Sequence, residues 1–287
     1  MTSTQGRATT VDGTELLTRH WPAAGEAWAS VLLVHGLGEH SGRYEHVGEQ
    51  LAAAGLDTFA YDNRGNGGST GRRGHVDRWS QYHDDLAERL AAVRSDSGGH
   101  PVALYGHSLG GLIVAGYCLT DQPKPDLVVL SSPGLDSTLP AWKKGLARVL
   151  GRVAPTLAIP NGVSGDTLSR DPSVAAKLNA DPMAARTSTA RFGAEALREQ
   201  VRVRSAAHGG LGVPTFVQHG QDDGLVPVGA SAVFEGSPLT TRRTFPGLRH
   251  ELHNEPEGPA VVDGVIAWLR EQVGDRDRVA ARGTLHA

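Results

Sequence analysis

The sequence predicts an α/β protein whose mostly parallel sheet carries helices on both faces. From Ser30 onward, short apolar runs with the length of buried strands alternate with segments that have helical period. Repeated strand-then-helix alternation is typical of a doubly wound parallel sheet. A second observation is a serine flanked by glycines at 106–110, which stands between one such strand and the helix that follows it.

The chain begins with a predicted hairpin. Residues 1–7 are expected to be a loose terminus, and a turn at Asp12-Gly13 then joins strands at 8–11 and 15–21. The polar, glycine-interrupted residues 274–287 are expected to be a frayed tail. Between these ends, strands are predicted at 30–34, 57–61, 101–105, 126–131, 213–219 and 241–246, and helices at 44–54, 77–94 and 112–119.

One interval interrupts the alternation. Between Ser132 and Val213 no strong strand is predicted, and the interval is too long for a simple crossover between neighbouring strands. We therefore predict that residues 135–208 form a helical cap, or lid, inserted over a core made of residues 1–134 and 209–287.

Composition bounds the class of protein. The 287 residues are 39% apolar and 21% charged, which is ordinary for a globular protein in water. A net charge of −3 gives no reason to expect a nucleic-acid partner. The single cysteine, Cys118, cannot form an internal disulfide. Because the sequence also lacks a signal-like region and a run of membrane-span length, a cytoplasmic location is expected. Nothing in the sequence predicts an oligomeric state.

The glycine-flanked serine carries the clearest chemical signal. Val102–Tyr105 has the length of a buried strand, Gly-His-Ser-Leu-Gly follows at 106–110, and a largely apolar helix comes next. Strand, Gly-x-Ser-x-Gly and helix in this order form the nucleophile elbow of α/β-hydrolases. Side chains at positions 106 and 110 would collide with neighbouring backbone in so sharp a turn. Ser108 is therefore the candidate nucleophile.

Ester hydrolysis on this fold also needs a base and an acid, in the chain order Ser, Asp, His. His250 follows the predicted strand at 241–246 in a loop from which an imidazole could reach the serine. His253 competes with it but lies further towards the last helix. The acid is expected after the strand at 213–219, where spacing alone does not choose between Asp222 and Asp223.

An oxyanion formed on this site needs two backbone N–H donors. One is expected from Leu109, directly after the candidate nucleophile. The other is expected from Leu37, in the glycine-rich loop at 35–38 that follows the first central strand.

Two further motifs do not meet their structural requirements. VLLVHGLGEHSG resembles a strand with a dinucleotide-binding fingerprint, and Asp62 ends the next strand, but Ser41 stands where the third glycine belongs. His250-Glu251-Leu252-His253 resembles a zinc-protease helix, but its histidines are three residues apart and not four. No metal site is therefore predicted.

Taken together, the motifs resemble the monoacylglycerol lipase family of serine hydrolases, including bacterial members labelled lysophospholipases. The resemblance extends from about residue 8 to residue 273. The elbow is common to many hydrolases, whereas HGxGEHSGRY and the cap segment SRDP…NADP are much more specific. The segments that carry the resemblance are HGLGEHSGRYEHVGEQLAAAGL, GHSLGG, SRDPSVAAKLNADP, HGQDDGLVP and FPGLRHELHNEPE.

The resemblance implies a set of catalytic residues. Ser108, Asp223 and His250 would form the triad, because the family pattern Gly-x-x-Asp-x-aliphatic selects Asp223. Leu37 and Leu109 would donate their N–H groups to the oxyanion.

The resemblance also implies a polar pocket for a glycerol head group near Glu39, Arg43 and His253. An alternative for Glu39 and Arg43 is a salt-bridged loop that only shapes the turn. Leu178 stands where family members often carry a tyrosine, so we expect head-group recognition to differ. The loop at 62–67 carries asparagines in place of the two family histidines, and we interpret that loop as structural.

The expected function is hydrolysis of monoacylglycerols to fatty acid and glycerol through an acyl-serine intermediate, without a cofactor. The expected partner is a small-molecule lipid ester. A lysophospholipase or a broad carboxylesterase would share every catalytic residue. An aminopeptidase on the same fold is less favoured, and a screen of peptide substrates would separate it. A catalytically inactive binding protein is disfavoured because all three triad positions carry competent side chains.

The cap begins with a predicted amphipathic helix at 139–153. The favoured interpretation is that its apolar face packs on the domain below and lines the acyl tunnel. The alternative is a transient contact of this face with a membrane or lipid-droplet surface, to which basic residues draw it. The apolar face consists of Leu139, Trp142, Leu146, Val149, Leu150 and Val153, and the basic residues off that face are Lys143, Lys144, Arg148 and Arg152.

Overall fold

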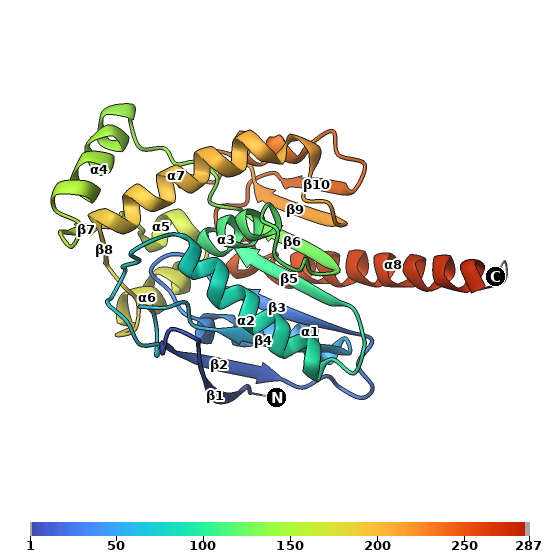
Figure 1. The fold of residues 1–287 in the computed structure, drawn as a ribbon. Coiled ribbons are helices and arrows are strands. Elements are labelled where there is room, and N and C mark those ends of the chain that lie inside the picture. The colour runs from blue at the N-terminus through green and yellow to red at the C-terminus, as the bar shows by residue number, and fades with distance from the viewer. Residues whose placement is uncertain (1, 285–287) are drawn as a thin grey trace.

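The protein is built around one large sheet, and the computed structural model describes residues 2–284 (Figure 1). The eight strands lie in the order β1-β2-β4-β3-β5-β6-β9-β10. Neighbours from β4 to β10 are parallel, whereas the β1–β2 and β2–β4 pairs are antiparallel. This confirms the predicted α/β class. The strands are β1 (Thr4–Thr9), β2 (Glu15–Trp21), β3 (Ala29–Val34), β4 (Leu56–Tyr61), β5 (Val102–His107), β6 (Leu127–Ser131), β9 (Thr215–Gly220) and β10 (Thr240–Phe245).

Helices cover both faces of this sheet, as the alternation predicts. The second and third helices pack on one face, and the first and last pack on the other. The helices are α1 (Glu45–Ala53), α2 (Ser80–Asp96), α3 (Leu109–Cys118), α4 (Ala141–Val153), α5 (Gly165–Leu168), α6 (Pro172–Ala180), α7 (Ala190–Ala206) and α8 (Gly258–Thr284), with 3-10 turns η1 (Ser41–Tyr44), η2 (Ala207–Gly209), η3 (Val228–Phe234) and η4 (Leu252–Asn254).

Strand β5 shows why the central strands are continuous apolar runs in the sequence. All six of its residues are buried. Val102 and Leu104 pack with α2 and α3, whereas Ala103 and Tyr105 pack with α1 and α8. A strand covered on both faces has no solvent-facing side, so the period-2 alternation of a half-exposed strand is absent.

Helices α4–α7 lie between β6 and β9 in the chain. Helices α4, α5 and α6 lie at the end of the sheet where the parallel strands finish, and α7 runs from there back to pack on α3 (Figure 1). The interval predicted to lack a long strand contains only β7 (Ala158–Pro160) and β8 (Thr187–Thr189), which pair with each other. Helix α4 packs along α7 at Gly151, where a Cβ atom would lie 2.4 Å from the Cβ of Ala194.

The apolar face of α4 is exposed, so the favoured interpretation that it packs on the domain below is wrong. Five of its members are 48–72% exposed. The physical reason is that α4 meets α7 through Gly151, which lies off the apolar arc of the helix. The exposed members are Leu139, Trp142, Leu146, Val149 and Val153.

Both chain ends are more regular than predicted. Thr4–Thr9 pairs with β2 as an edge strand, although residues 1–7 are expected to be loose. Its side chains are mostly exposed, so it gives no apolar pattern and is held by backbone hydrogen bonds. At the other end, α8 continues to Thr284 through the expected tail, because alanine and arginine favour helix. Residues 285–287 of that prediction lie outside the described residues.

Candidate active site

Ser108 lies at a sharp turn between β5 and α3. Its backbone has φ 51° and ψ −114°, a conformation that is strained for a residue with a side chain. Glycines allow this turn, because a Cβ at Gly106 would lie 2.5 Å from the Gly110 oxygen and one at Gly110 would lie 2.0 Å from the Val34 oxygen. This confirms that crowding by backbone atoms requires glycine at both positions.

Three side chains from separate loops form one hydrogen-bonded chain at this edge of the sheet. Ser108 Oγ lies 2.8 Å from His250 Nε2, and His250 Nδ1 lies 2.7 Å from Asp223 Oδ2. Ser108 follows β5, Asp223 follows β9 and His250 follows β10. Because parallel strands end at the same edge of a sheet, residues far apart in sequence meet there.

Of the two candidate acids, Asp223 faces His250. Its carboxylate is buried, and its Oδ1 accepts the backbone N–H groups of Leu225 (2.8 Å) and Val226 (2.9 Å). Asp222 is exposed at the surface. Spacing left the two aspartates open, and the structure brings Asp223 to the histidine.

The competing histidine, His253, lies in a buried group of rings. Its ring stacks on Tyr44 at a centroid distance of 4.8 Å and meets the His107 ring edge at 5.0 Å. Neither of its ring nitrogens has a hydrogen-bond partner among the described residues. The structure therefore brings His250, and not His253, to Ser108.

The pKa values of the acid and the base are shifted in opposite directions. Burial raises the pKa of Asp223, but hydrogen bonds from His219 and His250 outweigh it, so the net pKa lies well below its usual range. Burial lowers the pKa of His250, but the hydrogen bond and charge of Asp223 outweigh it, so the net pKa lies above 6.5. Burial lowers the pKa of the neighbouring His107 to about 3, which keeps that ring neutral. The ionised Asp223 thus accepts from His250 Nδ1–H, and Nε2 faces the serine.

The two backbone segments predicted to bind an oxyanion lie beside the serine. Leu109 is the first residue of α3, where a helix N–H has no acceptor within the helix. The loop after β3 lies against the turn, since a Cβ at Gly36 would be 3.2 Å from Ser108 Cβ. The N–H groups of Leu37 and Leu109 therefore belong to segments that approach Ser108 from two sides.

Glu39 holds the loop after β3 through several hydrogen bonds and an ion pair. Its Oε1 accepts the N–H of Gly36 at 2.5 Å and the hydroxyl of Tyr44 at 2.6 Å, and its Oε2 lies 3.5 Å from Arg43 Nε. Arg43 in turn binds both carboxylate oxygens of Glu251 at 2.7 and 3.0 Å. The loop after β3 is thereby joined to the loop that carries His250.

The two buried carboxylates share one guanidinium, and their pKa values separate. Burial raises the pKa of Glu251 to about 7, although Arg43 opposes the shift. Burial also raises the pKa of Glu39, but Arg43 and His107 outweigh it, so the net pKa of Glu39 is lowered. The cluster therefore takes up a proton on Glu251 first.

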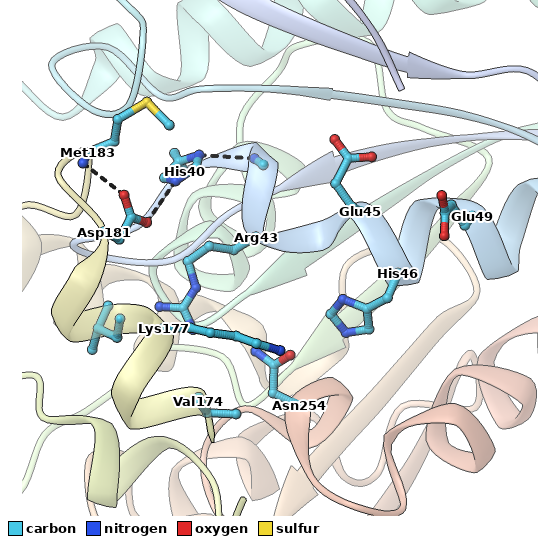
Figure 2. Close-up of a pocket in the computed structure, with 12 residues that line it drawn as sticks. His40, Arg43, Glu45, His46, Glu49, Val174, Lys177, Asp181, Met183 and Asn254 are labelled. Atoms are coloured by element: carbon cyan, nitrogen blue, oxygen red, sulfur yellow. Dashed lines mark hydrogen bonds and ion pairs between the residues drawn. The ribbon is translucent and has the colours of Figure 1, made fainter. Parts of the chain in front are cut away.

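A pocket of about 530 Å³ opens beside this cluster, between α1, α6 and η4 (Figure 2). Arg43 and Leu178 line it, whereas Glu39 and His253 lie in the buried layer next to it. Of the four residues predicted to form the head-group pocket, two therefore line this pocket and two are buried behind its wall. The other lining residues are His40, Gly42, Glu45, His46, Glu49, Val174, Lys177, Asp181, Met183 and Asn254.

Two residues of the site are missed by sequence reasoning. His219, at the end of β9, lies 3.0 Å from Asp223 Oδ2, and Glu251 binds Arg43. Each residue lies near a triad residue in the sequence: His219 precedes Asp223 in the pattern His-Gly-x-x-Asp, and Glu251 directly follows His250. Neither pattern predicts which side chain the residue contacts in the folded protein. Among residues 2–284, no cluster of three or more histidine, cysteine or acidic side chains is arranged to hold a metal ion.

A mostly parallel sheet of this topology, with a serine in a strained turn between strand and helix, defines an α/β-hydrolase. Residues 25–257 match the family model described as serine aminopeptidase, S33. The chain belongs to this family.

Several relatives of the chain are named as monoacylglycerol or monoglyceride lipases. A monoacylglycerol lipase of Mycolicibacterium smegmatis is 35% identical over 90% of this chain and 94% of that protein. Human monoglyceride lipase is 32% identical over 94% and 90%. The crystal structure of the Paleococcus ferrophilus monoacylglycerol lipase, 30% identical, superposes with a TM-score of 0.79 over 95% of this chain and all of that one.

Proposed function

We propose that the protein is a serine esterase that hydrolyses monoacylglycerols to a fatty acid and glycerol. The observation that carries this proposal is the continuous hydrogen-bonded chain from Ser108 through His250 to Asp223. It occurs in a chain whose relatives are named as monoacylglycerol and monoglyceride lipases.

The proposed reaction is a two-step acyl transfer. Ser108 Oγ attacks the ester carbonyl while His250 Nε2 takes its proton, and Asp223 holds the imidazole and stabilises its charged form. His250 then protonates the departing alcohol. Water, activated by the same histidine, attacks the acyl-serine and releases the fatty acid.

The N–H groups of Leu37 and Leu109 are the proposed donors to the negative oxygen of each tetrahedral intermediate. Glu39 supports the first of them, because its bond to Gly36 N–H fixes the loop that carries Leu37. For the alcohol part of the substrate, we assign contact to Arg43 and Leu178 on the pocket wall. Glu39 and His253 act from the buried layer behind them.

A substrate panel tests the function. Long-chain monoacylglycerols, lysophospholipids, short nitrophenyl esters and aminoacyl peptide substrates are compared by kcat/KM. We expect monoacylglycerols to give the highest value and Ser108→Ala to abolish turnover and labelling by a fluorophosphonate probe. A higher kcat/KM for lysophospholipids, simple esters or peptides would assign the site to that alternative. A wild-type protein that is not labelled would indicate a binding protein.

We also propose that residues 135–208 act as a cap and that the exposed face of α4 docks on a lipid surface. An apolar patch rimmed by cations fits an anionic membrane or lipid droplet. Lys143, Arg148 and Arg152 are exposed on the same helix outside its apolar arc, and Lys143 Nζ lies 5.5 Å from the centre of the Trp142 ring. Among the described residues, no helix has the length and apolar character needed to cross a bilayer.

Charge removal on α4 tests the docking. The combined change Lys143→Gln, Arg148→Gln and Arg152→Gln should lower turnover of long-chain monoacylglycerol on anionic vesicles and leave that of a short soluble ester unchanged. Lys144→Gln is the matched control, because Lys144 is half-buried and bonded to Asp136 at 2.7 Å. Equal rates of the triple variant and wild type on vesicles would rule out docking through these cations.

A cytoplasmic location, peripheral to the membrane, completes the proposal. Cys118 is buried, and burial raises the pKa of its thiol to about 12, so this cysteine is inert and demands no oxidising compartment. Cell fractionation tests the location. We expect the protein in the cytosol and in a membrane fraction from which salt releases it.

A further inference from the structure

A second histidine contacts the carboxylate that His250 uses. His219 is fully buried at the end of β9, and its Nε2 lies 3.0 Å from Asp223 Oδ2 and 3.2 Å from the Val226 carbonyl oxygen. His250 Nδ1 lies 2.7 Å from the same Oδ2. One carboxylate oxygen therefore faces two imidazole rings.

The neighbours of His219 decide which of its nitrogens carries hydrogen. An ionised Asp223 and a carbonyl oxygen only accept, so Nε2 must donate. Nδ1 lies 3.0 Å from Ser231 Oγ, which accepts from Arg242 Nε at 3.0 Å. The Ser231 hydroxyl also lies 3.0 Å from the Val228 carbonyl, which accepts from Arg242 Nη2 as well. Because that carbonyl keeps the Arg242 bond, the hydroxyl can turn its hydrogen to Nδ1 without leaving the carbonyl unpaired. A neutral ring with hydrogen on Nε2 satisfies every group.

These contacts fix the orientation of the carboxylate. Oδ1 accepts two backbone N–H groups, from Leu225 and Val226, and Oδ2 accepts one N–H from His219 and one from His250. Four hydrogen bonds fill the accepting capacity of a carboxylate. Rotation of the Asp223 side chain would break them together, so Oδ2 stays in line with His250 Nδ1.

We propose that His219 is a positioning residue of this active site, whose Nε2–H holds Asp223 Oδ2 and draws part of its negative charge away from His250. The inference rests on the proposed function, because a general base must be neutral before each attack. A carboxylate bonded to His250 alone would stabilise the charged ring more strongly. Sharing Oδ2 between two donors limits that stabilisation.

Other charged and titratable groups face the two ends of this arrangement. Arg242 approaches the Ser231 end from β10. At the other end, Glu251 and Glu39 act on His250 by charge, and the His107 ring from β5 lies 5.0 Å from it. Among the described residues, the side-chain hydrogen bonds to Asp223 come from His219 and His250. Replacing His219 therefore changes the partners of the Asp223 carboxylate and of Ser231, but it removes none of the groups that act on His250 directly.

Two substitutions separate the donor from the ring. His219→Phe keeps the shape and removes the N–H, whereas His219→Gln can place an amide N–H where Nε2 lies. With a short soluble ester, we expect His219→Phe to lower kcat by about tenfold to a hundredfold, the range for a hydrogen bond to a charged group. KM should stay unchanged, and the acidic limb of the kcat/KM profile should move to higher pH. His219→Gln should keep most of kcat and the wild-type limb.

A control variant and a spectroscopic measurement complete the test. His83→Phe removes another buried histidine, in α2 and away from the site, and should leave the limb in place. A folded His219→Phe variant with unchanged kcat and an unchanged acidic limb of the kcat/KM profile would overturn the inference. A His219→Gln variant whose kcat falls as much as that of His219→Phe would overturn it as well. If His219→Phe does not fold, ¹⁵N-histidine NMR of the wild type decides. We expect hydrogen on Nε2 of His219, and a bare Nε2 would overturn the inference.

This measurement needs no turnover, so it separates the two proposals. A wild-type protein inactive on every ester would refute the proposed function alone. An active wild type with a bare His219 Nε2 would refute the positioning role alone.

Discussion

Two adjacent aspartates in the loop after β9 have opposite surroundings. Asp223 is buried with four hydrogen bonds to its carboxylate, and Asp222 is exposed. Asp223→Asn would put an amide beside His250 and favour the wrong tautomer of the imidazole. We expect it to lower kcat by up to about 10⁴-fold. Asp222→Asn, the matched control, should change kcat little. A larger loss in the control would show that the acid is Asp222.

The base gives a prediction in pH. His250 works when neutral, and Asp223 holds its pKa above 6.5 against the opposing effect of burial. The value of kcat/KM should therefore rise with pH, with a midpoint above 6.5, as the charged ring loses its proton. The measurement is a pH profile on a soluble ester. A profile that is flat from about pH 5 to 9 would argue against a histidine base.

At the scale of elements, the loop after β3 depends on one side chain. Glu39→Ala would leave the buried N–H of Gly36 without its acceptor. The loop would then no longer be held in place, and the N–H of Leu37 would lose its position. We expect kcat on a soluble ester to fall by about tenfold or more while KM changes little. Glu39→Gln keeps an acceptor for Gly36 and should recover part of kcat. A change confined to KM in both variants would favour direct contact with the substrate.

Prediction of elements from sequence succeeded where burial sets a pattern. The runs that became β3, β5 and β6 are apolar because both faces of these strands are covered. The edge strand β1 has no such pattern, since its backbone bonds hold exposed side chains. The amphipathic pattern of α4 predicted a helix correctly. It did not determine whether the apolar face packs against the protein or is exposed, as the structure shows it to be.

At the scale of the whole molecule, the site residues fall into two groups: those that a local sequence motif predicts and those whose role depends on contacts between distant parts of the chain. Gly-x-Ser-x-Gly locates Ser108 because the turn itself needs those glycines. His219 and Glu251 carry no local requirement of this kind. The role of His219 arises from its contact with Asp223, and that of Glu251 from its contact with Arg43. Arg43 and Glu251 are 208 residues apart in the sequence. Such pairings exist only once the sheet has brought its strand ends together.

The Glu39–Arg43–Glu251 cluster links the stability of the whole fold to pH. Burial raises the folded pKa of Glu251 from 4.5 to about 7, so between these values the folded state binds more protons than the unfolded state. The contribution of Glu251 to the free energy of unfolding should therefore fall as pH rises through this range. His250, whose folded pKa is also raised, adds a loss of the same sign.

Thermal unfolding measured from pH 5 to 8 checks this expectation. In the wild type, Glu251 and His250 oppose His107, whose folded pKa of about 3 makes stability rise with pH up to about 6.5. Glu251→Gln, which has no proton to lose, should therefore show a Tm that rises more, or falls less, with pH than that of the wild type. Glu257→Gln is the control, because Glu257 is an exposed carboxylate paired with Arg170. An unchanged slope in Glu251→Gln would assign the pH dependence to other groups.

The bond between Ser108 and His250 closes a loop of 142 residues. A nascent chain that has passed β6 already contains the serine turn, yet it lacks both acid and base until β9 and β10 have been made. Contacts of such long sequence separation form late, because their loop-closure entropy must be offset first. In refolding, esterase activity should therefore return after Trp21 and Trp79 are buried, and its rate would time the last step of folding.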